Sequence, residues 1–264
     1  MKYIVLHSVV PVRSQASEAS EQLTQLLFGE TCEVIDSCPR WLKIINDADK
    51  QEGWVDFKMI APLSEEDAAL YAAANHEAVV KLPMTFAVSE ANRQTFPLTA
   101  GTRLCNYENG KFELLGSSFM IDPSAVAAKS LQLTEDNFKE TVRFFLNIPY
   151  LWGGKNAMGM DCSGFTSVVM SIFGKQLPRN ASEQVFCGEH RTFLEESVCG
   201  DLVFFDHHTH NPQQTNISHV GILLDQHTVI HCSGRVKIEN IDSNGIISQL
   251  TGEYTHDLRA IRHL

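Results

Sequence analysis

Short strand-like runs separated by turn residues recur through the first 62 residues, and this rhythm constrains the fold more than any other feature of the chain. Closely spaced short strands with turn signals between them are typical of a small barrel. The runs cover residues 9–13, 23–27, 31–35, 41–45 and 53–57. Residues 1–62 are therefore predicted to form a small all-β domain, whose first strand includes the apolar residues at the start of the chain.

A helix and a second β-rich segment are predicted next. Ser64 precedes three acidic residues and an alanine-rich run, so residues 63–76 are expected to form a capped helix that links two domains semi-rigidly. Residues 77–124 are predicted to form a second, more divergent β domain, inferred from rhythm because no closely matched internal repeat is visible. Its strand-like runs lie around residues 79–80, 85–88, 102–107 and 111–115, with a turn at 108–110.

Residues 125–264 are predicted to form a third domain, in which helices come before a sheet. A helix is expected to begin near Thr134, because apolar residues then recur at helical spacing. Those residues are Phe138, Val142, Phe145 and Leu146. A second helix, several β segments and a closing strand near residues 258–263 follow, and this order is typical of an α+β domain.

The second helix carries a candidate nucleophile. Cys162 lies between Asp161 and Ser163 at the start of an amphipathic run, which Gly174 ends. The apolar face of that run is Phe165, Val168, Val169, Ile172 and Phe173. Free backbone N–H groups and the helix dipole are expected to lower the pKa of a thiol on the first turn. The alternative is a buried thiol that acts only as a small apolar side chain.

Two histidines downstream are candidates for a base and an orienting group. Residues 217–224 and 228–233 have the pattern of a hairpin with a three-residue loop at 225–227. That register places Leu224 opposite Thr228, Gly221 opposite His231 and His219 opposite Ser233. The two histidines then share one sheet face as diagonal neighbours, where an imidazole can accept the thiol proton and the other can orient it. A two-residue loop would put them on opposite faces.

Several motifs of the last domain together resemble the NlpC/P60 cysteine peptidases of bacterial cell-wall metabolism, and the similarity covers about residues 125–264. They are PYLWGG at 149–154, DCSGF at 161–165, GDLVFF at 200–205, HVGI at 219–222 and IH at 230–231. The first domain is similar to a bacterial SH3 (SH3b) domain, through residues 12–14, 29–30, 41–44 and 53–55. The resemblance implies a multidomain chain with two small all-β SH3b-like barrels followed by an α+β, papain-like catalytic domain.

The resemblance also implies roles for individual residues. Cys162, His219 and His231 would be the nucleophile, the base and the orienting residue, and Tyr150 would support the oxyanion together with the Cys162 N–H. The residues that it places with substrate binding are Asp161, Ser163, Trp152, Arg179 and Ser182, with Asp56 added from the first β domain. Some of these roles have a structural alternative. Asp161 or Ser163 could simply cap the helix, Trp152 could pack on the sheet, and Asp56 could be an exposed residue at a strand end.

The implied reaction is hydrolysis of the bond between γ-D-glutamate and a diamino acid in peptidoglycan stem peptides, as in γ-D-glutamyl-L-diamino acid endopeptidases. Small muropeptides with a free N-terminal L-Ala are the expected substrates, and diaminopimelate and L-lysine both stay open. Asn180 stands where the family usually has aspartate, which leaves open whether the free amine is required. A thiol acyltransferase or amidase, and a non-catalytic peptidoglycan-binding adaptor, remain alternatives.

Composition limits the partners. A net charge of −11 with only 21 Lys and Arg residues argues against nucleic acid, and no apolar run reaches the length of a membrane span. The histidines of residues 206–210 lack companion ligands at zinc spacing, so neither metal nor cofactor is expected. Seven cysteines without paired spacing favour a reducing, cytoplasmic location, unless a leader was removed from a periplasmic or envelope protein. The oligomeric state is left open.

Overall fold

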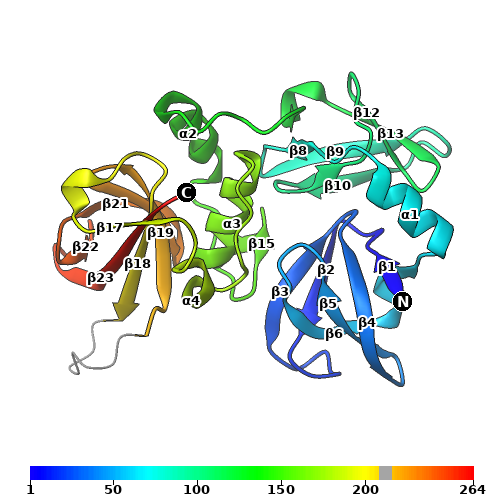
Figure 1. Ribbon diagram of the computed structural model, residues 1–264, viewed down its shortest axis with the longest axis horizontal. Coiled ribbons are helices and arrows are strands. Elements are labelled where there is room, and N and C mark those ends of the chain that lie inside the picture. The colour runs from blue at the N-terminus through cyan, green and yellow to red at the C-terminus, as the bar shows by residue number, and fades with distance from the viewer. Residues whose placement is uncertain (208–215) are drawn as a thin grey trace. The chain divides into compact units, whose positions relative to one another are not determined.

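The computed structural model describes residues 1–207 and 216–264, which form two compact units (Figure 1). The N-terminal unit consists of Met1–Leu131, Trp152–Ala157 and Ser171–Gly174. The C-terminal unit consists of Gln132–Leu151, Met158–Met170 and Lys175–Leu264. Of the histidines in residues 206–210, His207 lies at the end of a strand, and His208 and His210 are outside the described residues. Within the described ranges, no helix is long and apolar enough to cross a membrane.

The first β domain of the N-terminal unit is an antiparallel sheet in the order β3-β2-β6-β5-β4-β1-β7. Its strands are β1 (Lys2–Ile4), β2 (Val9–Arg13), β3 (Gln22–Leu27), β4 (Thr31–Cys38), β5 (Trp41–Asn46), β6 (Glu52–Asp56) and β7 (Ala61–Pro62), with the 3₁₀ turn η1 (Phe57–Met59) before β7. The five predicted runs coincide with β2 to β6, except that Phe57, the last residue of the fifth run, lies in η1. Gly53 is required where β6 crosses β2, because a Cβ there would lie 2.5 Å from Val12 Cγ1.

The predicted helix after this sheet is present as α1 (Glu65–Ala73). Ser64 caps it as predicted, since its Oγ accepts a hydrogen bond from the Asp67 N–H at 3.0 Å. One side of the helix contacts the β domains, because the Tyr71 hydroxyl donates to the Gly29 carbonyl at 2.6 Å. Ala68 and Tyr71 also pack against a buried apolar cluster. The helix is therefore held by tertiary contacts as well as by its cap.

The second β-rich region contains two small sheets, in the orders β10-β9-β13-β12 and β11-β8-β14. The strands are β8 (Ala78–Val80), β9 (Met84–Ser89), β10 (Thr95–Thr99), β11 (Arg103–Leu104), β12 (Lys111–Leu114), β13 (Ser117–Ile121) and β14 (Val126–Ala127), and the 3₁₀ turn η2 (Pro123–Ala125) precedes β14. β10, β13 and β14 lie outside the predicted runs. β10 contains Pro97, which lowers its strand signal, and most of its length is exposed or half-buried.

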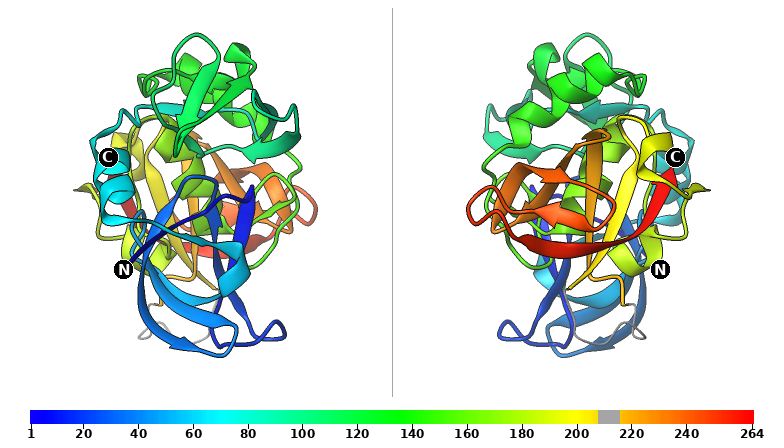
Figure 2. Two further views of the ribbon diagram at one scale, coloured as in Figure 1. Left: turned by 90° about the vertical axis from the view of Figure 1, so that its right-hand side faces the viewer. Right: turned by 90° about the vertical axis from the view of Figure 1, so that its left-hand side faces the viewer.

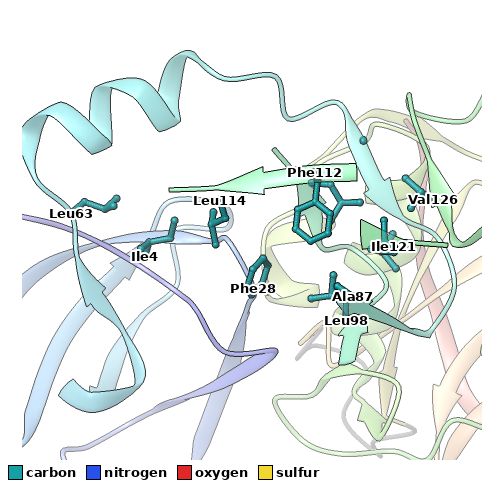
Figure 3. Packing of buried hydrophobic residues seen from close by; sticks show 12 residues of the cluster. Ile4, Phe28, Leu63, Ala87, Leu98, Phe112, Leu114, Ile121 and Val126 are labelled. Carbon is teal, nitrogen blue, oxygen red and sulfur yellow. The ribbon is translucent and has the colours of Figure 1, made fainter. Parts of the chain in front are cut away.

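One apolar cluster joins the two β-rich regions. Ile4, Phe28 and Leu63 come from the first region, and they contact buried residues of the second such as Phe112 and Leu114 (Figure 3). The Phe28 ring lies edge-on to Phe112, with their centroids 6.2 Å apart. The two β-rich regions therefore share this cluster, and the first region also has a separate core that includes Val10, Ile44 and Val55.

The C-terminal unit begins with α2 (Glu135–Val142), which starts near Thr134 as predicted and is capped by that residue, and the 3₁₀ turn η3 (Arg143–Phe145). The predicted apolar face is buried at Phe138, Val142 and Phe145, and half-buried at Leu146. The other short elements are β15 (Lys155–Asn156), which belongs to the N-terminal unit, β16 (Gly159–Met160), α3 (Cys162–Ile172), α4 (Ala181–Gln184) and the 3₁₀ turn η4 (Leu194–Glu196).

Within the described residues, the main sheet of this unit has the strand order β17-β23-β18-β19-β20-β21-β22. The strands are β17 (Glu189–Arg191), β18 (Leu202–His207), β19 (His219–Asp225), β20 (Thr228–Ser233), β21 (Arg235–Ile241), β22 (Gly245–Ile247) and β23 (Tyr254–His263). The long last strand pairs with both β18 and β22, so the sheet curls round and closes on itself (Figure 2). Helices first and then this sheet give the predicted α+β catalytic domain.

Candidate active site

The candidate nucleophile lies where the sequence predicts it. Helix α3 begins at Cys162, and Gly174, with φ of +75°, follows its end in a conformation that favours glycine. The predicted face is buried: Phe165, Val168, Val169, Ile172 and Phe173. Asp161 caps the first turn, because its Oδ1 accepts a hydrogen bond from the Gly164 N–H at 2.7 Å. Cys162 itself is 7% exposed, so the thiol is in a largely dry site.

The prediction that the pKa of Cys162 is lowered is wrong. Burial raises the pKa of the thiol to about 11, and the charge of Asp161 adds to the rise. Hydrogen bonds from the backbone N–H groups of Val220 and Ser163 act in the opposite direction but are outweighed. A thiol with this pKa is protonated near neutral pH, so attack by sulfur requires a base that accepts its proton. The Val220 contact also places the sulfur beside the start of β19, where His219 lies.

The two predicted histidines lie on one face of the sheet. Gly221 pairs with His231, as predicted. The pairing of Leu224 with Thr228 is wrong, because Asp225 faces Thr228 and a bulge leaves Leu224 without an opposing residue. The turn itself has two residues, Gln226 and His227, and the bulge restores the phase that a two-residue turn would otherwise invert. Sequence reasoning thus reached the correct face with the wrong loop length.

The rings of the two histidines are hydrogen bonded to each other. His219 Nε2 lies 2.8 Å from His231 Nδ1, and both side chains are buried. Gly221 leaves room for this contact, because a Cβ there would lie 2.6 Å from Val229 Cγ2 and 3.1 Å from His231 Cβ. Burial lowers the pKa of His231 despite the opposing effect of a carboxylate partner. The orienting ring is therefore neutral near pH 7.

That carboxylate belongs to Glu239 on β21, which sequence analysis missed. Glu239 Oε2 lies 2.9 Å from His231 Nε2 and 2.9 Å from Lys237 Nζ. Burial acts to raise the pKa of Glu239, but hydrogen bonds from His231 and Lys237 prevail and lower it to about 2. Glu239 is the diagonal neighbour of His231, because Lys237 is the residue directly opposite. The sequence does offer one signal for Glu239: it lies two residues after Lys237, the residue that pairs with the candidate His231.

A third histidine also reaches this cluster. The buried ring of His256, from β23, stacks on the ring of His219 with their centroids 4.3 Å apart and their planes at 30°. The His256 ring is 6.0 Å from that of His231. The closing strand therefore supplies a flat surface against which the ring of His219 rests. Since β23 lies far along the chain from β19 and the motif resemblance does not include it, sequence analysis did not find this residue.

Tyr150 also lies near the thiol. Its N–H donates to the Gly234 carbonyl at 2.9 Å, and its backbone bridges to that of Met160, just before the nucleophile helix. Burial raises the pKa of the Tyr150 phenol, and the negative charge of the Cys162 thiolate raises it further. The phenol thus stays protonated and can donate a hydrogen bond close to the sulfur.

Asp161, Ser163 and Arg179 form a buried network next to the nucleophile. The Arg179 guanidinium binds both oxygens of Asp161, at 3.0 and 2.5 Å, and donates to Ser163 Oγ at 2.9 Å. Arg179 is 2% exposed, so this bidentate pair is out of contact with bulk water. The network fixes the loop before α4 against the first turn of α3. The predicted contacts of these residues with substrate stay a prediction.

The remaining predicted substrate-binding residues occupy different settings. Ser182 is exposed on α4, and Asn180 precedes it, with its side-chain amide 3.1 Å from Glu183 Oε2. Trp152 belongs to the N-terminal unit, where its Nε1 donates to Glu21 Oε1 at 2.7 Å. Asp56, in the same unit, is 5% exposed and caps η1. Asp56 is thus neither the exposed strand end considered as its alternative nor a member of the C-terminal unit.

Cysteine, histidine and acidic side chains do not converge in a metal-binding arrangement anywhere in residues 1–207 and 216–264. The groups that converge are a thiol, imidazoles, a carboxylate and a phenol. Such a set can deprotonate a nucleophile and stabilise an oxyanion.

Comparisons with known proteins identify relatives of both the C-terminal domain and the first β domain. Residues 147–255 match the model of the NlpC/P60 family, and residues 8–59 match that of the bacterial SH3 domain. A gamma-D-glutamyl-L-lysine dipeptidyl-peptidase of Bacillus subtilis is 28% identical over 220 residues, which are 79% of this chain and 71% of that protein. A protein of the same name from Bacillus cereus is 30% identical over 120 residues, covering 44% of this chain and 35% of the relative.

Solved structures share the fold. The crystal structure of an NlpC/P60 family protein from Bacillus cereus has a TM-score of 0.80 at 19% identity, and the match covers 100% of this chain and 99% of that one. An NlpC/P60 endopeptidase from Photobacterium damselae has a TM-score of 0.71 at 18% identity, covering 98% of this chain and 70% of that one. At these identities the likeness concerns the fold alone.

Proposed function

We propose that this chain, which belongs to the NlpC/P60 family of cysteine peptidases and carries an N-terminal bacterial SH3 domain, hydrolyses the γ-D-glutamyl–diamino acid bond of peptidoglycan stem peptides. The observation that carries the proposal is the match over 79% of the chain to a relative named for a γ-D-glutamyl-L-lysine dipeptidyl-peptidase. The hydrogen bond that links His231 to His219, on the strand whose Val220 N–H donates to the Cys162 sulfur, is consistent with this chemistry.

The reaction begins with proton transfer from the Cys162 thiol to His219. The thiolate attacks the γ-glutamyl carbonyl carbon, and the Cys162 N–H and the Tyr150 phenol donate to the oxyanion that forms. His219 then returns the proton to the departing amine of the diamino acid, which leaves a thioester on Cys162. Water, deprotonated by the same imidazole, hydrolyses the thioester and frees the dipeptide and the thiol. His231 keeps the ring of His219 in position throughout.

We further propose that the substrates are small muropeptides such as L-Ala-γ-D-Glu-diamino acid. The name dipeptidyl-peptidase of the Bacillus relatives supports this choice, since such an enzyme removes two residues from a free N-terminus. Asn180 provides a neutral amide where a carboxylate would favour the substrate ammonium, so dependence on the free amine is the property to measure.

The test uses four tripeptides, L-Ala-γ-D-Glu-meso-diaminopimelate, its L-lysine analogue and the N-acetylated form of each, with products identified by mass. Release of L-Ala-γ-D-Glu and the free diamino acid is expected, and Cys162→Ala should release neither. A new amide or ester would show acyl transfer instead. Faster digestion of polymeric sacculi than of free tripeptide would contradict the preference for small muropeptides.

A further inference from the structure

We propose that Glu239 is a positioning residue, which fixes where the protons lie on the two catalytic rings and so keeps the lone pair of His219 turned toward the thiol. The inference rests on the proposed function, because it assigns His219 as the base. It extends the cysteine–histidine–histidine set by a residue outside the motifs that carry the family resemblance.

Both carboxylate oxygens of Glu239 face hydrogen-bond donors, so each oxygen must act as an acceptor. Its Oε2 faces His231 Nε2 at 2.9 Å and Lys237 Nζ at 2.9 Å, and its Oε1 accepts from the Gln249 N–H at 3.2 Å. Lys237 Nζ and the Gln249 N–H can only donate, and an ionised carboxylate can only accept. The side chain is 3% exposed, so water does not compete for these contacts. His231 therefore presents a proton on Nε2.

If the neutral His231 ring carries its proton on Nε2, the position of the proton on His219 is determined as well. His231 Nδ1 then carries a lone pair, and it faces His219 Nε2 at 2.8 Å. That contact is a hydrogen bond only if His219 Nε2 carries a proton. The neutral ring of His219 consequently has its lone pair on Nδ1, the one nitrogen that does not face His231. This is the tautomer that can accept the proton of Cys162.

The charged state after proton transfer is supported by the same contacts. When His219 becomes an imidazolium, its Nε2–H still donates to His231, whose own Nε2–H donates to the Glu239 carboxylate. Lys237 is a fixed positive charge beside Glu239, and His256 lies against the face of His219. Glu239 provides the negative charge at the end of this line of rings, so its removal leaves a new cation in a buried site without its compensating carboxylate.

Glu239→Gln tests the idea with almost no change in volume. The amide of the new side chain has two orientations. In one, its NH₂ faces His231 and Lys237; in the other, its NH₂ faces the Gln249 N–H, which is also a donor. When the NH₂ faces His231, the Lys237 side chain, which is 27% exposed, turns toward solvent. The His231 proton then shifts to Nδ1, and the His219 proton is thereby pushed from Nε2 to Nδ1. We expect kcat to fall roughly 10²–10⁴-fold, with KM changed less than about threefold. Glu239→Asp should recover part of kcat, because it restores an acceptor.

The activity assay is paired with a readout that needs no substrate. Alkylation of Cys162 by iodoacetamide, followed at its own peptide by mass spectrometry across pH, reports the reactive thiolate. We expect Glu239→Gln to slow alkylation at pH 7 by roughly tenfold and to move its pH profile upward. Glu253→Gln, which removes an exposed carboxylate of the same unit, should match the wild type.

The outcomes separate the two proposals. If the wild type does not cleave any of the tripeptides but Glu239→Gln slows alkylation, the proposed function fails and the role of Glu239 stands. If Glu239→Gln matches the wild type in both kcat and alkylation, the role of Glu239 is overturned. Should the variant unfold, ¹⁵N NMR of the histidines in Cys162→Ala decides: protons on Nε2 of both His231 and His219 support the inference, and protons on Nδ1 contradict it.

Discussion

The N-terminal and C-terminal units each bury a small group of charged side chains, and the two groups are built differently. In the N-terminal unit, Lys155 Nζ lies 3.5 Å from Glu30 Oε1 and 3.3 Å from Asp49 Oδ2. In the C-terminal unit, the carboxylate of Glu239 contacts Lys237 and also a neutral ring, and that ring is hydrogen bonded to the ring of His219. The first group joins full charges, and the second joins a charge to groups that exchange protons.

The difference shows how burial serves two purposes. Around Lys155 the ammonium lies between two carboxylates, so the arrangement joins segments that are far apart in the sequence. Around His231 burial keeps the ring neutral, and Glu239 determines which of its nitrogens carries the proton. We expect damage to the Lys155 group to lower stability alone, and damage to the Glu239 group to lower both stability and catalysis.

The largest expected effect is the loss of activity in Cys162→Ala. Removal of the nucleophile should lower kcat on the order of 10⁴-fold or more, while the free energy of unfolding changes by about 1 kcal/mol. Cys38→Ala, at an exposed thiol, is the matched control and should keep full activity. A Cys162→Ala protein that still releases diamino acid would remove this site from the reaction.

Lys155→Met should cost the most stability. It leaves the half-buried carboxylates of Glu30 and Asp49 without their cation, which we expect to cost about 3–5 kcal/mol in urea unfolding. Lys111→Met breaks an exposed pair with Glu90 in the same unit and should cost less than about 1 kcal/mol. Equal losses in the two variants would show that the Lys155 group is not a buried structural ion pair.

The pH dependence of stability should have opposite signs in the two groups. The pKa of Glu239 is lowered to about 2, so its contribution is present above its unfolded pKa and is lost as pH falls from about 4.5 to 2. It amounts to roughly 3 kcal/mol, seen as the difference in unfolding free energy between the wild type and Glu239→Gln. Burial raises the pKa of Glu30, so its contribution relative to Glu30→Gln is instead lost as pH rises through the folded value. Parallel pH curves for the two variants would contradict the comparison.

Gly221→Ala should have a smaller effect, which appears in both the free energy of unfolding and kcat. The added methyl must displace Val229 or the His231 Cβ, so we expect a loss of about 1–3 kcal/mol in stability. Because His231 moves away from His219, kcat should fall further than the stability change explains, with the variant assayed well below its unfolding temperature. Full activity would mean that the ring contact tolerates displacement.

The smallest expected effect belongs to Ser182→Ala. The side chain is exposed on α4, so stability should change by less than about 0.5 kcal/mol. If Ser182 binds substrate as predicted, loss of one hydrogen bond should raise KM for the tripeptide by roughly 2–10-fold and leave kcat unchanged. An unchanged KM would exclude Ser182 from the binding site.

The sequence was most informative where local pattern and structure coincide. The runs at β2 to β6, the cap at Ser64 and the helix from Cys162 all follow from periodicity and composition. Residue Glu239 did not, because β21 alternates Lys237 and Glu239 with Val236 and Ile238, which is the pattern of a strand with one solvated face. Closure of the sheet by β23 buries that polar face, and closure depends on long-range pairing that no local pattern encodes.

The predictions of the Cys162 pKa and of the length of the hairpin loop were wrong for related reasons. A helix start predicts a lowered thiol pKa only if the site remains hydrated, and the burial of Cys162 arises from tertiary packing. The bulge at Leu224 likewise has no signature in the apolar run of β19. Local reasoning therefore identified the candidate reacting groups, but their electrostatic surroundings depend on the folded sheet.

The bulge at Leu224 also bears on how alignment gaps in this hairpin should be interpreted. Leu224 is the residue that β20 does not oppose, so its deletion leaves Gly221 facing His231 and both rings on their common side. Deletion of Ile222 shortens the chain by the same amount but turns His219 to the other side of the sheet. The position of a one-residue gap between the two histidines, and not the distance along the chain, decides whether a homologue keeps its catalytic geometry.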